Sequence, residues 1–207
     1  MIRNIVFDMG KVLMTYDPMV PCLRHAGSIE EARAVYEALF MAKEWEEKLD
    51  GCFINEAEML KIAQSRLPTP ELQKLCADTF ADYHVDALEP IPGMEEIVEM
   101  LKRRGFGLYV LSNVGERIDK FKARLPGYGS FDGFLFSGEE KMIKPDPEIF
   151  RLLCRRFGLK PEECLFVDDR KKNTDAAAAV GMAGYLFENM DAAALKTYLE
   201  GLPEVQK

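Results

Sequence analysis

The chain has 207 residues, enough for one well-buried core and a modest inserted module. Its hydrophobic fraction of 48% and charged fraction of 30% are typical of a soluble globular protein. The formal net charge of -8 argues against non-specific nucleic-acid binding, which depends on an excess of lysine and arginine. A small anionic substrate stays open, because a few local cations and a metal ion can override the overall charge.

Targeting and cysteine signals are weak in this sequence. No apolar run approaches the ~20 residues that a membrane helix needs, and the first residues resemble a strand rather than a signal peptide. We therefore expect a cytoplasmic protein with no membrane partner. The five cysteines are scattered and include no CxxC pair, so we expect reduced thiols rather than disulfides or a zinc site.

The chain begins with a predicted strand and continues with a helical stretch. Residues 2–7 form a short apolar run typical of a strand buried on both faces. Residues 17–88 contain helix-start signals but no convincing strand pattern. The signals are Ser28 with Glu31, which opens a helix predicted to reach Leu49, Asn55 with Glu58, and Thr69 before Pro70. We expect residues 17–88 to be a small helical cap inserted into a core domain made of residues 1–16 and 89–207.

Predicted strands and helices alternate after the helical stretch. The strands are expected at residues 107–111, 132–136, 163–167 and 184–187. The helices are expected from Pro92 to Arg104, within 115–125, from Pro147 to just before Gly158, over about 173–180, and after Asp191. This alternation implies a parallel sheet with right-handed crossovers, so the predicted fold class is α/β, a three-layer sheet core with an inserted helical cap.

Polar residues follow several predicted strands at the point where each strand ends. They are Asp8 after the first strand, Ser112 and Asn113 after the second, Lys144 in the loop after the third, and Asp168 and Asp169 after the fourth. Because the carboxyl ends of parallel strands meet at one edge of the sheet, these groups are expected to converge there.

The converging residue types suit phosphoryl transfer. A carboxylate such as Asp8 can attack phosphorus and hold the phosphoryl group, which splits one hard hydrolysis into two easier steps. The repulsion between carboxylate and phosphate needs counter-charge, which Lys144 and a metal ion can supply. Asp8, Asp169 and Asp168 are hard oxygen ligands that suit Mg²⁺. The Ser112 hydroxyl and nearby backbone N–H groups can hold the remaining phosphate oxygens.

Four motifs in order resemble those of the haloacid dehalogenase superfamily, most of whose members are phosphatases. They are IVFDMGKV, LSN, the lysine of KPDPEIF, and FVDDRKKN. The resemblance implies a Rossmann-like core and a small helical cap, and it covers nearly the whole chain. It implies that Asp8 is the nucleophile and a metal ligand, together with the Gly10 backbone carbonyl and Asp169, and that Asp168 binds the metal through water. It implies that Ser112 and Lys144 bind phosphate with Asn113 beside them, and that Lys144 touches Asp8. Asn173 is expected to steady the loop.

Gly10 departs from the family pattern. Most family phosphatases carry a second aspartate at this position, which acts as general acid and base and is typically worth ~10²–10⁴ in rate. The motif D-x-G-x-V resembles a subgroup that includes sugar-phosphate phosphatases. We expect a preference for better leaving groups, such as anomeric sugar phosphates or acyl phosphates. Alternatively another group supplies the proton, and Asp17 and Lys11 are the nearest in sequence.

The sequence leaves three functions open. The first is a Mg²⁺-dependent phosphatase for a small phosphorylated metabolite, expected to be a sugar phosphate. The second is a 2-haloacid dehalogenase, since those enzymes also lack the second aspartate. The third is a catalytically degenerate binding protein, because a fold does not guarantee activity. The expected assembly is a monomer or small homo-oligomer, and Trp45 or Phe53 is the expected cap contact to substrate.

Overall fold

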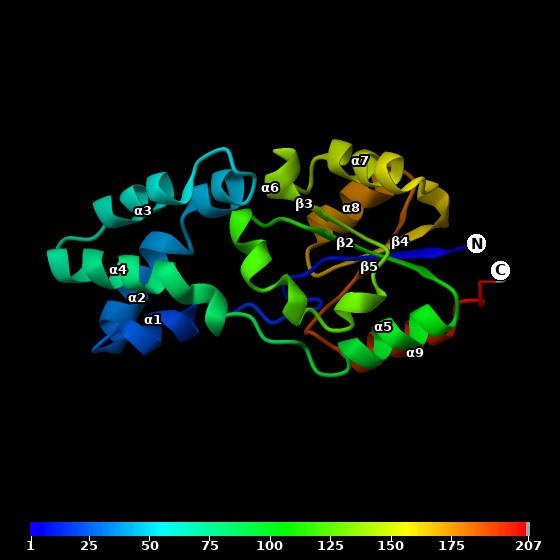
Figure 1. Ribbon diagram of the computed structural model, residues 1–207, viewed down its shortest axis with the longest axis horizontal. Helices are drawn as coiled ribbons and strands as arrows, with labels where there is room; N and C mark the ends of the chain where they lie inside the picture. The colour runs from blue at the N-terminus through cyan, green and yellow to red at the C-terminus, as the bar shows by residue number, and fades with distance from the viewer. Residues whose placement is uncertain (206–207) are drawn as a thin grey trace.

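Five parallel strands form one sheet in the right-hand part of the molecule in Figure 1. The computed structural model describes residues 1–205, so the last two residues of the expected core domain lie outside the described residues. The strands are β1 (Asn4–Phe7), β2 (Gly107–Ser112), β3 (Gly133–Phe136), β4 (Cys164–Asp168) and β5 (Ala183–Leu186), in the order β3-β2-β1-β4-β5. The predicted parallel sheet is confirmed, with strand ends shifted by no more than two residues.

Helices cover both faces of the sheet, because the strands alternate their side chains between two apolar layers. Ile5 and Phe7 of β1 pack into one cluster with α5 (Met94–Arg103) and α9 (Ala192–Glu200). Val6 points into a second cluster that includes α7 (Pro147–Phe157) and α8 (Lys171–Ala179). The three-layer α/β/α arrangement is therefore confirmed.

Local signals set the ends of the core helices. Asp146 caps α7 through the Glu148 N–H, Pro147 takes the first helical position, and the helix ends at Gly158 in the left-handed conformation. Asp191 caps α9 as predicted, its side chain accepting from the Ala194 N–H. α5 starts two residues later than predicted, after Gly93 at φ +89°, a value that glycine adopts without strain.

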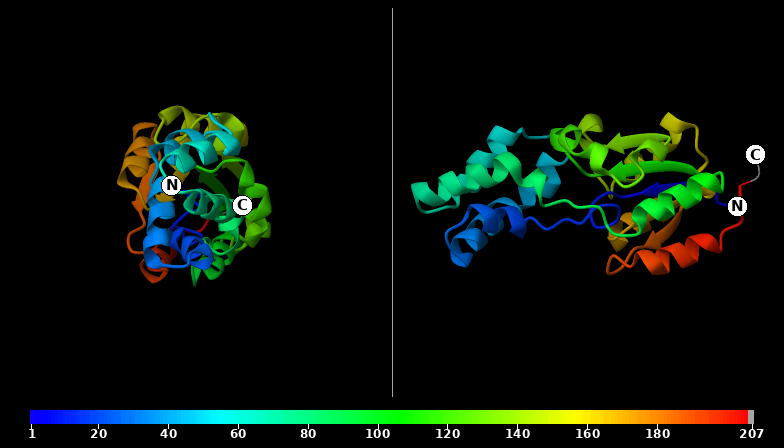
Figure 2. Two further views of the ribbon diagram at one scale, coloured as in Figure 1. Left: turned by 90° about the vertical axis from the view of Figure 1, so that its left-hand side faces the viewer. Right: turned by 60° about the horizontal axis from the view of Figure 1, so that its bottom comes forward.

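A separate group of helices lies at the other end of the molecule, on the left in Figure 1 and in the right-hand view of Figure 2. We call residues 17–88 the helical block. It contains α1 (Met19–His25), α2 (Ile29–Leu39), the π-helix η1 (Trp45–Leu49), α3 (Glu56–Ser65), α4 (Pro70–Asp82) and the 3₁₀-helix η2 (Tyr83–Val85). These helices bury an apolar cluster of their own, distinct from the two layers beside the sheet.

Two of the three predicted starts in the helical block are made as expected, and the third is made only in part. Asn55 and Glu58 form a complete capping box, and the Thr69 hydroxyl accepts from the Leu72 N–H ahead of Pro70. Ser28 caps α2, but the carboxylate of Glu31 accepts from the Gly27 N–H instead of completing the box.

The prediction of one helix reaching Leu49 is wrong. α2 ends at Leu39, and the chain breaks before η1 begins. Two residues five apart on a straight α-helix point about 140° away from each other. The break lets Phe40 and Trp45 meet with ring centroids 4.7 Å apart, and both pack on Tyr83. Aromatic packing thus overrides helix continuity here.

Several short elements also differ from the prediction. The segment 115–125 forms two 3₁₀-helices instead of an α-helix, and α1 was not foreseen because it lacks a capping side chain. The short elements of the core are η3 (Glu116–Lys120), η4 (Lys122–Arg124), η5 (Tyr128–Ser130), α6 (Ser137–Glu140) and η6 (Pro161–Glu163).

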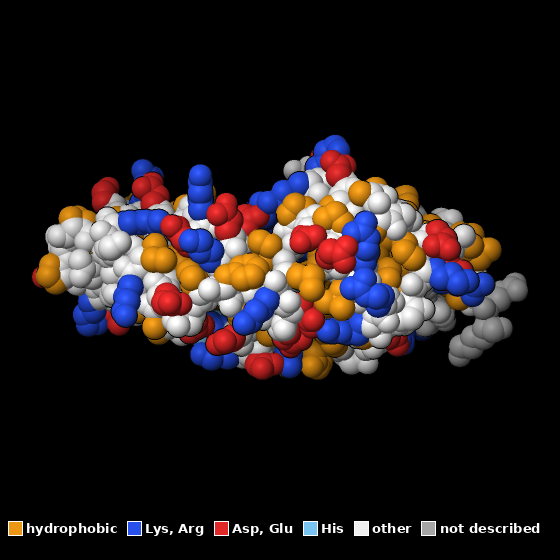
Figure 3. Space-filling model, turned by 90° about the horizontal axis from the view of Figure 1, so that it is seen from above, with side chains coloured by type: hydrophobic (Ala, Val, Ile, Leu, Met, Phe, Trp, Pro, Cys, Tyr) orange, Lys and Arg blue, Asp and Glu red, His pale blue; other side chains and the backbone are white. Residues whose placement is uncertain are grey.

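The surface and the thiols agree with the composition. All five cysteines are free, as predicted. Acidic and basic side chains are interspersed over the face drawn in Figure 3, with no broad area of one sign. Among residues 1–205, no helix has both the length and the apolar character to cross a membrane. The cellular location stays a prediction.

Candidate active site

The predicted site residues lie at the carboxyl ends of neighbouring strands. Asp8 directly follows β1, Ser112 is the last residue of β2, and Asp168 is the last residue of β4. β1 lies between β2 and β4 in the sheet, so the three side chains meet at one edge. Parallel strands buried on both faces leave this edge as the place where polar side chains can gather.

Lys144 bridges two of the carboxylates. Its Nζ lies 2.7 Å from Asp8 Oδ1 and 2.8 Å from Asp168 Oδ2, and it donates to the Leu111 carbonyl at 3.0 Å. The side chain is only 2% exposed. Burial by itself would lower the pKa of Lys144, but the two carboxylates outweigh it and raise the pKa, so the ammonium form is held.

The backbone of Lys144 is fixed by Asn113. The Asn113 side chain accepts from the Lys144 N–H at 2.8 Å and donates to the Lys144 carbonyl at 2.9 Å. This pairing joins the end of β2 to the loop that carries the lysine. Both ends of the Asn113 amide are used in this pairing, so the phosphate contact predicted for this residue is left to its second Nδ2–H or its backbone N–H.

Asp8, Asp168 and Asp169 form a compact acidic cluster. Each offers one carboxylate oxygen within 4.8 Å of the others. Asp168 is fully buried and accepts from Lys144, from the Asn173 side-chain amide and from the Arg170 N–H. Asn173 thus positions the buried carboxylate, and Asp169 lines the cavity beside it.

Burial raises the pKa of Asp8 to about 6, an effect that Asp168 reinforces and Lys144 opposes. Burial and the neighbouring Asp168 likewise raise the pKa of Asp169. Carboxylates held this close repel one another, and a bound cation relieves that repulsion. The site therefore favours an additional positive charge.

The donor set fits a hard divalent cation. Three carboxylates supply oxygen ligands of the kind that Mg²⁺ prefers. Asn173 Oδ1 is buried at the same edge without a hydrogen-bond partner, so an acceptor is left over for a metal-bound water. Gly10 lines the same cavity, and a Cβ added there would meet no atom within 4 Å. The residues present thus fit a small, partly hydrated metal ion.

Comparison with known proteins identifies the family. The family model for haloacid dehalogenase-like hydrolases matches residues 2–181. The chain belongs to the haloacid dehalogenase-like hydrolase family. It is a hydrolase, as the motifs predicted.

Relatives of known activity in the family are similar over most of the chain. A sesquiterpene phosphatase of Aspergillus oryzae is 29% identical over 88% of this chain and 88% of its own length. A phosphorylated carbohydrates phosphatase of Thermotoga maritima is 26% identical over 86% of this chain and 81% of its own. A crystal structure of a dehalogenase has a TM-score of 0.69 at 20% identity, covering 99% of this chain and 98% of that one, which shows the shared fold.

A cavity of about 850 Å³ separates the acidic cluster of this hydrolase from the helical block. The sheet domain contributes Asp8, Ser112 and Lys144 to its lining. The lining from the helical block is largely aromatic and acidic: Tyr36, Phe40, Trp45, Tyr83, Glu46, Glu47 and Asp50. Trp45 faces the cavity as predicted, whereas Phe53 is not among the lining residues and is 53% exposed.

Several cavity residues were missed by the sequence reasoning. Glu46 lies in η1 and Asp50 directly follows it, and no spacing rule ties that helix to the end of a strand. Their place follows from how the helical block sits on the family's core, which the sequence pattern does not encode. Tyr16 also lines the cavity, and its hydroxyl is buried without a partner.

Proposed function

We propose that this hydrolase is a Mg²⁺-dependent phosphatase that acts on a small phosphorylated metabolite, with a sugar phosphate as the favoured substrate. The observation that carries the proposal is the buried lysine between Asp8 and Asp168, facing a cavity at the edge of the sheet. This arrangement keeps a carboxylate and a cation in contact where a phosphate can enter.

The residues divide the work as follows. Asp8 attacks phosphorus and carries the phosphoryl group as an acyl phosphate, which water then hydrolyses. Lys144 holds Asp8 in place and neutralises charge on the phosphate, and the Ser112 hydroxyl donates to a phosphate oxygen. Asp8, Asp169 and the Gly10 carbonyl would hold Mg²⁺, with Asp168 acting through water, and the bound ion would supply further charge neutralisation at phosphorus.

The helical block acts as a cap over the cavity, and the core domain consists of residues 1–16 and 89–207. Both chain crossings between the two parts lie beside the cavity, since Tyr16, Asp17 and Leu88 line it. A cap that closes over the cavity keeps bulk water from the first step and contacts the non-reacting part of the substrate.

The relatives support the reaction class. Two that align over most of the chain are phosphatases, one named for sesquiterpenes and one for phosphorylated carbohydrates. Both names describe small phosphorylated substrates, although these differ in polarity. The feature that the two relatives are expected to share with this chain is therefore the site that binds the phosphoryl group.

A dehalogenase is the second candidate, because Gly10 lacks the acid that phosphatases of this family usually carry. A carboxylate nucleophile could equally attack carbon in a halocarboxylate. Against this reaction, the cluster of Asp8, Asp168 and Asp169 suits a metal ion, which dehalogenation does not need. The metal requirement therefore separates the two candidates.

Phosphate release from a panel of sugar phosphates and acyl phosphates tests the proposal. We expect release that needs Mg²⁺, stops with EDTA and is absent in Asp8→Asn. The proposal is overturned if folded protein releases no phosphate from any member of the panel, and chloride release from 2-chloropropionate without Mg²⁺ would establish the dehalogenase instead.

A further inference from the structure

The glycine at position 10 leaves the proposed phosphatase without a proton donor on its own strand end. Gly10 lines the cavity, and among residues 1–205 no atom lies within 4 Å of the position that a Cβ would take there. Asp17 is exposed, and its carboxylate accepts from the Met19 N–H at the start of α1. Lys11 is exposed, and a lysine side chain suits phosphate attraction more than proton donation. The donor must be sought elsewhere on the cavity wall.

Asp50 lies on the opposite wall, at the end of η1. Its N–H donates to the Trp45 carbonyl at 3.1 Å, and its own carbonyl accepts from the Ser137 hydroxyl of α6. The backbone of Asp50 is therefore fixed to the helical block and to the sheet domain at once. The side chain lines the cavity that also contains Asp8 and Gly10.

The carboxyl group of Asp50 has no partner among residues 1–205. No hydrogen-bond donor and no basic side chain contacts it, although the residue is partly buried. Asp8 and Glu46 differ in this respect, since Asp8 contacts Lys144 and Glu46 contacts Arg170, whereas Asp169 resembles Asp50 in having no ion-pair partner among residues 1–205. A carboxyl group left without a cation in a partly buried position is poorly suited to the ionised form.

The surroundings of Asp50 favour its protonated form. Burial raises its pKa well above the usual range, the charges of Glu46 and Asp8 raise it further, and Arg170 opposes them. Tyr16, Tyr83 and Cys52 are further titratable neighbours, and burial raises the pKa of all three. Glu56, Glu116 and Arg117 line a smaller adjoining cavity together with Asp50. These surroundings favour the neutral acid form of Asp50, whereas the Lys144 ammonium favours the ionised form of Asp8.

We infer that Asp50 is the general acid and base of this enzyme, taking the role of the aspartate that Gly10 replaces. The inference rests on the proposed phosphatase function and extends it. The acid is delivered by the helical block, so proton donation requires that the block sits against the sheet domain.

The proton balance closes over both steps. Asp8 Oδ forms a bond to phosphorus, the bond from phosphorus to the leaving-group oxygen breaks, and that oxygen takes the proton of Asp50. Asp50, now a carboxylate, removes a proton from water as the water oxygen attacks the phosphorus of phospho-Asp8. The bond from phosphorus to Asp8 breaks, which releases phosphate and restores the Asp8 carboxylate and the protonated Asp50.

Asp50→Asn tested on substrates with graded leaving groups distinguishes this role. Asparagine is nearly isosteric and neutral, so it removes the proton with little change in packing. For glycerol phosphate, whose alkoxide must be protonated as it leaves, kcat/KM should fall by about 10²–10⁴. For acetyl phosphate, whose acetate leaves unprotonated, kcat/KM should change by less than about threefold, because kcat/KM reports only the steps up to departure of the leaving group. The turnover number kcat should be lower for both, since hydrolysis of phospho-Asp8 is common to them.

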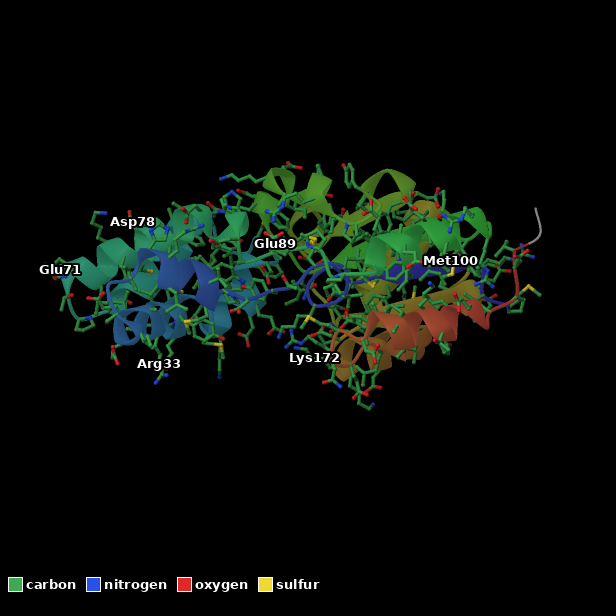
Figure 4. All side chains as sticks on the ribbon, turned by 90° about the horizontal axis from the view of Figure 1, so that it is seen from below. Arg33, Glu71, Asp78, Glu89, Met100 and Lys172 are labelled. Carbon is green, nitrogen blue, oxygen red and sulfur yellow. The ribbon has the colours of Figure 1, made fainter. Side chains whose placement is uncertain are left out.

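Asp78→Asn is the matched control, since Asp78 is a half-exposed aspartate of the helical block that pairs with Lys74 and lies away from the cavity (Figure 4). It should leave both kcat/KM values unchanged. Retained activity on acetyl phosphate shows that the Asp50 variant is folded, and Asp50→Glu, which keeps an acid, should restore part of the glycerol phosphate activity. An equal loss on both substrates in folded Asp50→Asn overturns the inference. Absence of phosphate release by the unsubstituted enzyme from these two substrates and from every member of the panel of sugar and acyl phosphates would instead overturn the phosphatase function.

Discussion

At the scale of single residues, the buried lysine is the group on which the site depends. Lys144 neutralises Asp8 and Asp168 at 2.7 and 2.8 Å with almost no exposure to solvent. Removing one partner of a buried ion pair leaves an uncompensated charge, which commonly costs about 3–5 kcal/mol. The stability and the chemistry of this edge thus depend on the same ammonium group.

Lys144→Met should lower the free energy of unfolding by about 3–5 kcal/mol and abolish phosphatase activity. Adding Asp168→Asn to that variant should recover part of the stability, because one of the two stranded charges is removed, but none of the activity. Urea unfolding and phosphate release measure the two effects. Lys102→Met is the matched control, since that lysine pairs with Asp132 at the surface and should cost less than about 1 kcal/mol. An equal loss of unfolding free energy in Lys144→Met and Lys102→Met would contradict the stabilising role of the buried ion pairs.

The sequence predicted most of this constellation because strand ends are readable from it. Asp8, Ser112 and Asp168 each follow an apolar run, and parallel strands must bring such positions together. The use of the Asn113 side chain to hold the Lys144 backbone was not predictable, because it depends on the path of a loop. Asp50 was missed for the same kind of reason, since η1 exists only because aromatic packing breaks the preceding helix.

At the scale of elements, Arg117 joins the helical block to the core. It lies in η3, its side chain is 8% exposed, and it pairs with Glu56 at the start of α3. The guanidinium also lies over the rings of Phe80 and Tyr83, at 4.4 and 5.1 Å from their centroids. Hydrogen bonding to Arg117 lowers the pKa of Glu56, so folding favours the ionised carboxylate.

Glu56→Gln should therefore cost stability at neutral pH but not in acid. The pKa of Glu56 is lower in the folded chain than its usual 4.5, so its contribution is complete above that value and is lost as pH falls through the folded pKa. Because the Glu56–Arg117 pair is partly exposed, we expect Glu56→Gln to lower the free energy of unfolding by up to about 1 kcal/mol at pH 7. Urea unfolding at pH 7 and at about pH 3.5 measures the difference between variant and unsubstituted chain. Glu37→Gln, on an exposed residue of α2, should leave the free energy of unfolding unchanged at either pH. A loss of unfolding free energy in Glu56→Gln that grows in acid would contradict the stabilising role of the Glu56–Arg117 pair.

A second link between the parts runs from η1 to the start of α8. Glu46 accepts from Arg170 at 2.6 and 3.0 Å and from Lys172 at 2.7 Å. Figure 4 places Lys172 at the junction between the helical block and the sheet domain. All three side chains remain partly exposed, so salt screens their attraction. This link should hold the cavity closed more firmly at low ionic strength.

Glu46→Gln should raise KM by up to a few-fold at low salt, since each exposed pair contributes about 0.2–1 kcal/mol. The KM of the unsubstituted enzyme should rise with added NaCl more steeply than that of the variant, because only the former has these pairs to lose. Steady-state kinetics over a salt series gives both slopes. Glu44→Gln is the control, since Glu44 pairs with Arg66 inside the helical block and its loss should leave the slope unchanged. Parallel slopes for Glu46→Gln and the unsubstituted enzyme would exclude this role.

At the scale of the whole molecule, binding of a metal ion at the acidic cluster would be coupled to folding. The acidic cluster joins the ends of β1 and β4, and neither carboxylate position exists in the unfolded chain. A ligand that binds only the folded state stabilises it by mass action, by about 2.7 kcal/mol at one hundred times its Kd. A rise in the Tm on adding the metal ion therefore measures metal binding without any assumption about the substrate.

Mg²⁺ at such a concentration should raise the Tm of this chain by roughly 5–10 °C, as expected for a protein of this size. Asp169→Asn should abolish most of the rise, because Asp169 is the cluster carboxylate that lines the cavity without an ion-pair partner among residues 1–205. Asp175→Asn, on an exposed residue of α8 paired with Lys171, should keep the full rise. Differential scanning calorimetry with NaCl at matched ionic strength separates binding from screening. If Mg²⁺ shifts the Tm of Asp169→Asn as much as that of the unsubstituted chain, the cation binds outside the cluster, and the metal assignment fails even where phosphate release is observed.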